Sequence, residues 1–239
     1  MYFKNADQII EEYGVKDFVE SYISKFIYGI TFLPVEKLNA FMFLYLSLAC
    51  FGKIYDFKFL QNKITSGFED KVIVASVHKI KKAKGHYIAS TSSKDYLAKN
   101  VVIATPPHIS KKLLNLKQIN QAAFVNMFHV SGQMKPTFQD YKYNLFSSDI
   151  EITGISAELD STFLVYSKNN SPDFEKYFEK YSIIHHHYWN PAFNLIGHTL
   201  LDSKQDENLY LIGDNNVCGM EEAFITGLYA ANQIIKSVT

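Results

Sequence analysis

Apolar residues recur at helical spacing over the first fifty residues of the chain. Residues 9–13 and 18–26 predict two short helices, and residues 35–50, which follow Pro34, predict a third. The longest apolar run, residues 41–51, is about half of the ~20 residues that a membrane-spanning helix needs. We therefore expect a buried helix there, and no transmembrane segment.

The pattern then changes to the alternating and continuous apolar runs that are typical of strands. Residues 72–80 and 86–91 predict a hairpin around the turn residues Lys84-Gly85, and residues 101–104 predict a buried strand. Two prolines follow this strand, so a helix is predicted from about His108, because a proline costs little at the start of a helix.

The central part of the chain predicts a second group of strands, separated by turn residues. They are expected at residues 122–130, 141–146, 150–156 and 162–166. Residues 173–184 predict a helix, and residues 185–207 predict a loop. The overall prediction is a mixed α/β (α+β) chain.

The last thirty residues predict a strand, a polar loop and a long helix. Residues 209–212 form a continuous apolar run, and Gly213-Asp214 ends it, so Asp214 lies where α/β sheets bind ligands. The small residues Ala223, Gly227 and Ala231 lie four apart and predict a closely packed helix face. The helix start can hold an anionic group, although an ordinary strand–turn–helix unit would show the same pattern.

Composition narrows the possible partners. The 239 residues, 47% of them hydrophobic, are enough for a substantial core. A net charge of +0 gives no electrostatic basis for binding nucleic acid. The sequence contains lysine and no arginine, which removes bidentate clamps for carboxylates. The two cysteines, Cys50 and Cys218, predict no disulfide framework and favour a cytoplasmic setting.

The closing segment contains the pattern G-D-x(n)-G-M-E-x-A-x-x-T-G-x-x-A-A. It resembles the C-terminal motif of FAD-dependent amine oxidases and their relatives, which include protoporphyrinogen oxidase, phytoene desaturase and prenylcysteine oxidase. The family often has glycine where this chain has Glu222. The resemblance implies contacts with the ribityl–pyrophosphate part and the pyrimidine edge of FAD from Gly213, Asp214, Gly219, Met220 and Glu221.

A second segment, residues 71–107, resembles the same family. Val77 and Ile80 match its V-x-x-I pattern, and Ala104-Thr105-Pro106-Pro107 match the end of its V-I-x-A-x-P-P pattern. The resemblance implies that the backbone of Val77 contacts the adenine of FAD, and that Thr105 and Pro106 pass close to the nucleotide. A generic hairpin followed by a strand–helix junction is the alternative.

No G-x-G-x-x-G fingerprint occurs anywhere in the chain. The resemblance therefore implies a partial FAD-binding Rossmann-like sheet together with a substrate domain built from an antiparallel sheet and helices. We expect a helical part of the substrate domain at residues 1–60 and the FAD-domain meander and strand at residues 61–116. The substrate-domain sheet and helix are expected at residues 117–200, and the FAD-binding strand and helix at residues 201–239.

The absent fingerprint suggests a split enzyme. Apolar strand edges left open aggregate unless another chain covers them, so we expect a second polypeptide to supply the GxGxxG domain and FAD to bind across the interface. The substrate would be a small amine, a prenyl thioether or an isoprenoid-like lipid, which gives a hydride to the flavin. A non-catalytic scaffold derived from such an enzyme, and a truncated chain, are the alternatives.

Four further features have possible roles. Family members carry a lysine that holds a water near flavin N5, so Lys135 is a candidate for it, and Trp189 is a candidate wall of the substrate cavity. Residues His185–His187 cannot all face one metal ion, because neighbouring strand residues point to opposite faces. Cys218 would face the ribityl side of a flavin, which disfavours a thioether to the ring.

Overall fold

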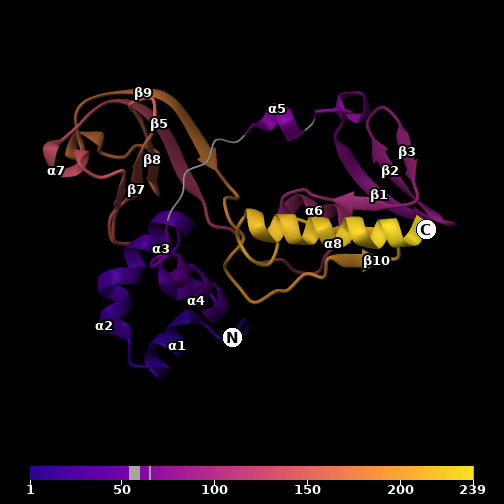
Figure 1. Ribbon diagram of the computed structural model, residues 1–239, viewed down its shortest axis with the longest axis horizontal. Coiled ribbons are helices and arrows are strands. Elements are labelled where there is room, and N and C mark those ends of the chain that lie inside the picture. The colour runs from indigo at the N-terminus through magenta and orange to yellow at the C-terminus, as the bar shows by residue number, and fades with distance from the viewer. Residues whose placement is uncertain (54–59, 65, 239) are drawn as a thin grey trace. The chain divides into compact units, whose positions relative to one another are not determined.

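The computed structural model describes residues 1–53, 60–64 and 66–238. The chain forms two compact units, each made from two stretches of sequence (Figure 1). Unit 1 comprises residues 1–52 and 120–199, and unit 2 comprises residues 53–119 and 200–239. No helix in the described part of the chain is both long and apolar enough to cross a bilayer.

Unit 1 begins with the predicted helical segment. Its elements are α1 (Ala6–Glu12), α2 (Lys16–Phe18), a π-helical turn (Val19–Ile23), α3 (Ser24–Thr31), a 3₁₀ turn (Val35–Lys37) and α4 (Ala40–Ala49). The third predicted helix starts five residues late. Asn39 sets this start, because its side-chain oxygen accepts a hydrogen bond from the Met42 backbone N–H at 2.9 Å.

The rest of unit 1 is an antiparallel sheet of five strands in the order β6-β7-β8-β5-β9. The elements are β5 (Val125–Met134), α7 (Pro136–Gln139), β6 (Tyr143–Leu145), β7 (Ile152–Ala157), β8 (Thr162–Ser167), a 3₁₀ turn (Phe174–Lys176) and β9 (Phe178–Trp189). Strands β5 to β8 confirm the four predicted strands of this region to within a few residues.

The predictions of a helix at residues 173–184 and a loop at residues 185–207 are wrong. Most of the first range and the start of the second form β9, which pairs with β5 from Val125↔Trp189 to Met134↔Phe178. Residues 204–206 form a further strand. The long partner strand β5 decides the structure here, because sheet pairing overrides local helix propensity.

The two faces of this sheet pack differently. One face holds a buried core that includes Phe128, Val130 and Val165, which the 3₁₀ turn near Phe174 covers. The other face lies against α3, where Gly29 approaches the side chain of Leu145 on β6. Since successive strand residues alternate between faces, each face carries its own set of side chains.

Unit 2 contains two small sheets. An antiparallel meander, β1-β2-β3, is formed by β1 (Val77–Ala83), β2 (His86–Thr91) and β3 (Asp95–Ala98). The second sheet has the order β10-β11-β4 and contains β4 (Val101–Ile103), β10 (Lys204–Asp206) and β11 (Leu209–Leu211). The helical elements are α5 (Gln61–Ile64), a 3₁₀ turn (Glu69–Lys71), α6 (Pro107–Leu114) and α8 (Met220–Val238).

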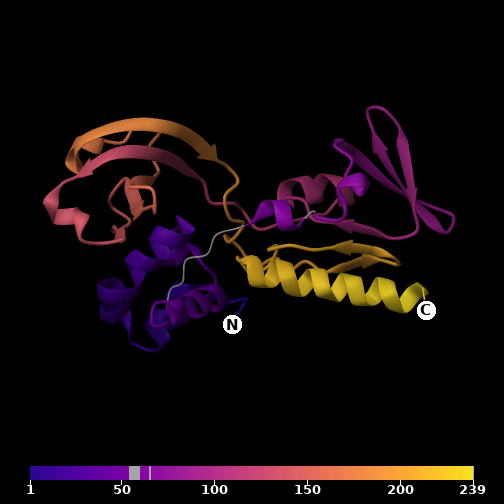
Figure 2. The ribbon, with the colours of Figure 1, turned by 45° about the horizontal axis from the view of Figure 1, so that its top comes forward.

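The sequence predicted most of these elements. The hairpin strand expected from residue 72 begins only at Val77, and β3 lies in a segment that was expected to be a polar loop. Residues Tyr87, Ile103, Leu209 and Leu211 form one buried cluster that joins the two sheets. Helix α8 lies beside the β10–β11 strands (Figure 2).

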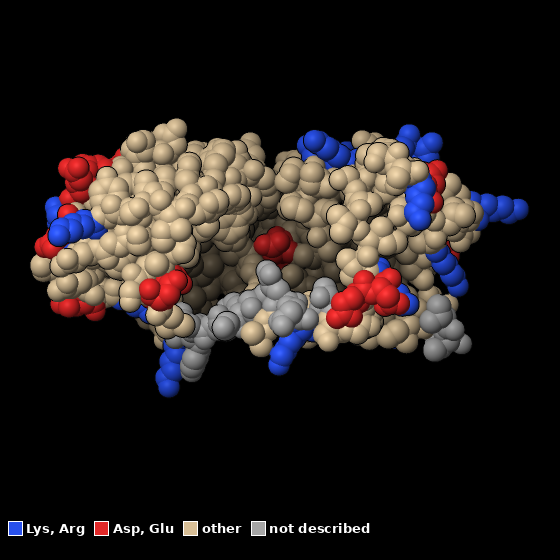
Figure 3. All heavy atoms as spheres, turned by 90° about the horizontal axis from the view of Figure 1, so that it is seen from above, with Lys and Arg blue, Asp and Glu red and all other residues tan. Residues whose placement is uncertain are grey.

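Helix α8 packs through a different set of residues from the one expected. Ala230 is 1% exposed, and Gly227 lies against Ile212, but Ala231 is exposed. In the view of Figure 3, each unit shows charged side chains of both signs mainly towards its outer edge, beside broad uncharged areas.

Candidate functional site

Two parallel strands of unit 2 end side by side at the predicted cofactor segment. Strands β4 and β11 pair in parallel, with Ile103 opposite Leu211, and the Ile212 N–H donates to the Ile103 carbonyl at 2.9 Å. Thr105-Pro106 therefore follows one strand and Gly213-Asp214 follows its neighbour. The carboxyl ends of neighbouring parallel strands are where α/β sheets bind ligands.

A hydroxyl on α8 fixes the end of β11. The Gly213 N–H donates to Oγ1 of Thr226 at 3.0 Å, and that hydroxyl donates to the Glu222 carbonyl at 2.8 Å. Gly213 has φ +117°, a conformation that disfavours a side chain. Because its N–H already donates to Thr226, Gly213 has no free N–H for a phosphate. Its contribution to the site is the backbone conformation at the end of β11.

Glu222 turns back into the loop. Its Oε2 accepts hydrogen bonds from the backbone N–H groups of Asn216, at 3.2 Å, and of Val217. Burial raises the pKa of the Glu222 carboxyl above its ordinary value. The residue therefore holds the loop between β11 and α8.

The neighbouring thiol of Cys218 is largely buried and has a raised pKa. Burial raises the pKa of Cys218 to about 11, with the nearby Asp214 carboxylate adding to the effect. The thiolate is the nucleophilic form of cysteine. A neutral Cys218 thiol gives no support for a covalent bond to a cofactor.

The loop offers several polar groups to a bound molecule. Asp214 is exposed at the end of β11, and Asn215 is 7% exposed with an Oδ1 that has no hydrogen-bond partner among the described residues. Gly219, at φ +133°, leads into the first turn of the 19-residue helix α8, where helix N–H groups favour negative charge. These groups fit the hydroxyl-bearing and electron-rich parts of a flavin.

The structure places most of the predicted cofactor residues at two paired strand ends and at the start of the helix that follows one of them. Thr105 and Pro106 follow β4, and Gly213 and Asp214 follow β11. Gly219, Met220 and Glu221 lie at the start of α8. Val77 belongs to the other sheet of unit 2, at the start of β1 in the meander, and is 37% exposed. The sheet pairing that joins the other residues does not include Val77.

Trp189 lines a second candidate site, which we call the aromatic pocket. This cavity of about 380 Å³ lies in unit 1 between α3 and the sheet. Its rings are Phe32, Tyr143, Tyr166, Trp189 and Phe193, with centroids 5.4 Å apart for Phe32–Tyr166 and 5.1 Å for Trp189–Phe193. Burial raises the pKa of the Tyr166 phenol, so the pocket is lined by neutral groups.

Lys135 lies at the other end of β5 from Trp189. Trp189 pairs with Val125 at the start of the strand, and Lys135 follows Met134 at its end. Ten residues of strand separate the two ends by roughly 30 Å. Lys135 is therefore not part of the aromatic pocket, and its role beside a flavin stays a prediction.

The three consecutive histidines lie on β9 and alternate between its faces. The His186 ring stacks on Phe128 with centroids 4.3 Å apart, and its Nε2 lies 3.0 Å from Oδ1 of Asn126. Among the described residues, no group of three or more His, Cys, Asp or Glu side chains is arranged to hold a metal ion. His186 takes part in packing and in a polar contact.

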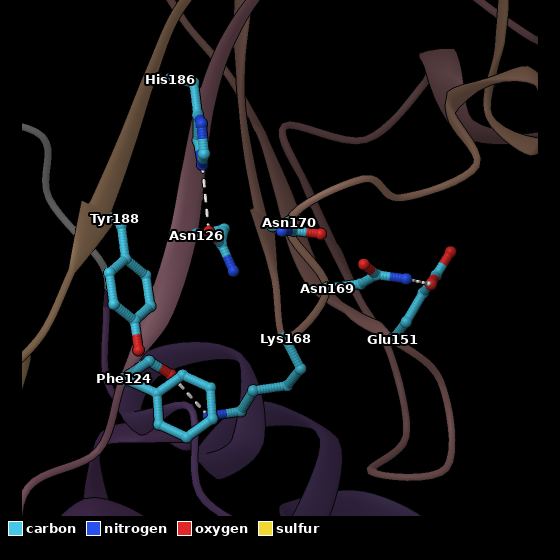
Figure 4. Close-up of a pocket in the computed structure, with 8 residues that line it drawn as sticks. All are labelled: Phe124, Asn126, Glu151, Lys168, Asn169, Asn170, His186 and Tyr188. Atoms are coloured by element: carbon cyan, nitrogen blue, oxygen red, sulfur yellow. Dashed lines mark hydrogen bonds between the residues drawn. The ribbon is translucent and has the colours of Figure 1, made fainter.

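The sequence did not predict a second cavity of unit 1, which we call the polar pocket (Figure 4). It has a volume of about 710 Å³ and is lined by Phe124, Asn126, Glu151, Lys168, Asn169, Asn170, His186 and Tyr188. The sequence feature that could have indicated this pocket is Asn126, a polar residue inside the apolar run that forms β5. Its partners come from distant parts of the sequence, so the pattern alone could not assemble them.

The fold of this chain is similar to the folds of several enzymes of known structure. A double mutant of putrescine oxidase, from a structure-based redesign of cofactor binding, matches 98% of this chain and 68% of its own, with a TM-score of 0.65 and 12% identity. A CLA-producing fatty acid isomerase from P. acnes matches 98% of this chain and 66% of its own, with a TM-score of 0.64 and 12% identity.

A putative protoporphyrinogen oxidase from Exiguobacterium sp. 255-15 matches 92% of this chain and 63% of its own, with a TM-score of 0.54 and 15% identity. No protein-family profile and no curated sequence matches the chain. The chain therefore shares the fold of these three proteins, at identities that show the fold alone.

Proposed function

We propose that this chain forms one wall of the FAD site of an oxidoreductase, and that a second polypeptide supplies the other wall. The observation that carries the proposal is the pair of parallel strand ends, Thr105-Pro106 and Gly213-Asp214, beside the start of α8. The family motif, found in this order in the sequence, and the structural likeness to putrescine oxidase support the same assignment.

The need for a partner rests on open apolar surface in unit 2. Within the described residues, β4 pairs only with β11, so its outer edge carries no strand, and Val102 is 41% exposed. Helix α8 also exposes a row of large apolar side chains, Met220, Phe224, Leu228 and Ile235. Open strand edges and apolar patches of this kind are typical of protein interfaces.

A dinucleotide-binding domain is the partner that fits this surface. The chain has no glycine fingerprint, and its sheet ends at β4, where a further parallel strand could pair. We propose that the partner adds its strand to β4, covers the exposed row on α8, and supplies the glycine-rich turn for the FAD pyrophosphate. Its own helix N-terminus would hold that phosphate charge.

The residues of this chain would hold and position the cofactor. The Asp214 carboxylate accepts hydrogen bonds from sugar-alcohol hydroxyls, and the first turn of α8 favours negative charge at the pyrimidine edge. The bound flavin supplies the chemistry, by accepting a hydride from the substrate. The loop stays in place through the contacts of Thr226 and Glu222.

The aromatic pocket would hold an apolar part of the substrate. Its five rings and neutral lining favour hydrocarbon or a neutral amine, and they offer no cation for a carboxylate. The chemistry of a small amine, a prenyl thioether or an isoprenoid-like lipid matches this lining. Putrescine oxidase, which has the same fold, is named for a small amine.

The test is reconstitution. The chain is purified alone and after co-expression with each of its neighbouring reading frames, and bound FAD is measured by visible absorbance after gel filtration. The proposal expects FAD in a heteromeric complex and little FAD on the chain alone. Colourless chain from every co-expression would argue against it, and a yellow complex whose flavin no candidate substrate reduces would favour a non-catalytic scaffold.

In the complex, Asp214→Ala is expected to lower FAD occupancy, because it removes the carboxylate at the end of β11. Asp202→Ala is the matched control, since Asp202 is also an exposed carboxylate of unit 2 but lies before β10. Equal FAD binding by both variants would contradict the assignment of Asp214.

A further inference from the structure

The polar pocket lies on the opposite face of the unit 1 sheet from the aromatic pocket. Trp189 pairs with Val125, and both point to the α3 face, whereas their neighbours Tyr188 and Asn126 pair with each other and point to the other face. A molecule in the polar pocket would therefore be separated from the aromatic pocket by the sheet itself.

A buried amide points into this pocket, and only its oxygen has a hydrogen-bond partner among the described residues. Asn126 is 4% exposed, and its Oδ1 lies 3.0 Å from Nε2 of His186. Its Nδ2 forms no hydrogen bond with any described residue and points into the space between Tyr188 and Lys168 (Figure 4). An amide N–H₂ is a donor only, so a ligand atom that meets it must be an acceptor.

The Lys168 ammonium group also has hydrogen-bond donors left for a ligand. Lys168 Nζ donates to the Phe124 carbonyl at 2.7 Å and lies 4.6 Å from the centre of the Phe124 ring. An ammonium group has three donors, so two remain. Among the described residues, no carboxylate forms an ion pair with Lys168.

The acidic residue of the pocket is already engaged. One oxygen of Glu151 accepts from Nδ2 of Asn169 and the other from the backbone N–H of Asp173, both at 3.0 Å. Glu151 therefore holds the loop after β8. The titratable side chains that line the pocket together with Lys168 are Glu151, His186 and Tyr188.

We infer that the polar pocket is a binding site for a small carboxylate that carries a flat apolar group. The carboxylate would lie between the Lys168 ammonium and the Asn126 amide, which are both donors. The apolar group would pack on the rings of Phe124 and Tyr188, whose centroids are 6.2 Å apart in an edge-to-face arrangement. This site is independent of the proposed flavin site.

The titration of Lys168 gives the site a distinctive pH dependence. Burial lowers the pKa of Lys168 to about 8. A carboxylate binds the ammonium form, so its affinity is constant well below pH 8 and falls as the pH rises through that value. Between pH 7 and pH 9 the charged fraction, and with it the affinity, is expected to drop about tenfold.

Titration calorimetry of the full chain with phenylacetate tests this inference. We expect saturable binding at pH 7, about tenfold weaker binding at pH 9, and at least about tenfold weaker binding by Lys168→Met. Lys168→Arg should keep binding and lose the pH dependence, because arginine stays charged. Lys180→Met, an exposed lysine of the same sheet outside the pocket, is the matched control.

Neutral phenylacetamide should bind more weakly than phenylacetate at pH 7. The inference is overturned by the absence of saturable phenylacetate binding, by equal affinity at pH 7 and pH 9, or by equal affinity in the wild type and Lys168→Met. Circular dichroism of each variant shows that it is folded before its affinity is compared.

Discussion

The hydroxyl of Thr226 gives a sharp test of how the cofactor loop is held. It accepts a hydrogen bond from the Gly213 N–H at 3.0 Å and connects the end of β11 to the first turns of α8. Thr226→Val keeps the shape of the side chain and removes the hydroxyl. The half-buried Gly213 N–H then has no protein partner, a loss of about 1–2 kcal/mol.

Hydrogen exchange measured by mass spectrometry reports this loss locally. A loss of about 1–2 kcal/mol corresponds to a factor of roughly 5–30, so exchange in a peptide that contains Gly213 should accelerate by that factor in Thr226→Val. Thr226→Ser keeps the hydroxyl and should exchange at nearly the wild-type rate. Unchanged exchange in Thr226→Val, or equal acceleration in both variants, would refute the role of this contact.

Three further predictions follow from particular contacts. Gly132→Ala is expected to destabilise unit 1 by about 1–3 kcal/mol, because a Cβ there would overlap the Lys180 carbonyl and lie 2.9 Å from Tyr181 Cα. Urea unfolding, followed by the fluorescence of the single tryptophan, Trp189, measures this loss. Gly154→Ala should cost less, because a Cβ at Gly154 would make only ordinary contacts. Asn39→Ala should cost about 2–4 kcal/mol in the same assay, since it removes the cap of α4 and the hydrogen bond to the Gly197 carbonyl at 3.3 Å. Asn39→Ser, which keeps a side-chain oxygen for the cap, should cost less. Labelling of Cys218 by a thiol reagent should be slow at pH 8 and rise about tenfold per pH unit towards its pKa of about 11; fast labelling at pH 8 in the folded protein would contradict this.

The helical spacing and the apolar runs predicted most elements because they record burial directly. Residues 209–211 form a strand that is buried throughout, and α8 begins at Met220, where the glycine and the amphipathic pattern placed it. The sequence also placed the candidate cofactor residues after two apolar strands, and their role at a cofactor stays a prediction. Parallel pairing of those strands then brings their ends together.

The wrong prediction at β9 and the missed polar pocket have one physical cause, which is long-range pairing. Residues 178–189 contain few helix-breaking residues and yet form β9, because ten positions of β5 pair with them. The polar pocket was missed for the same reason. Asn126, Lys168 and Tyr188 are neighbours only through the pairing of β5 with β8 and β9, and no local pattern shows which distant strands will meet.

The most direct test of the central claim is FAD retention by the complex of this chain with its partner. We predict that the complex retains FAD through gel filtration, that the chain alone does not, and that Asp214→Ala lowers the occupancy while Asp202→Ala leaves it unchanged. A complex that stays colourless, or one that binds FAD equally well with Asp214→Ala, would contradict the account.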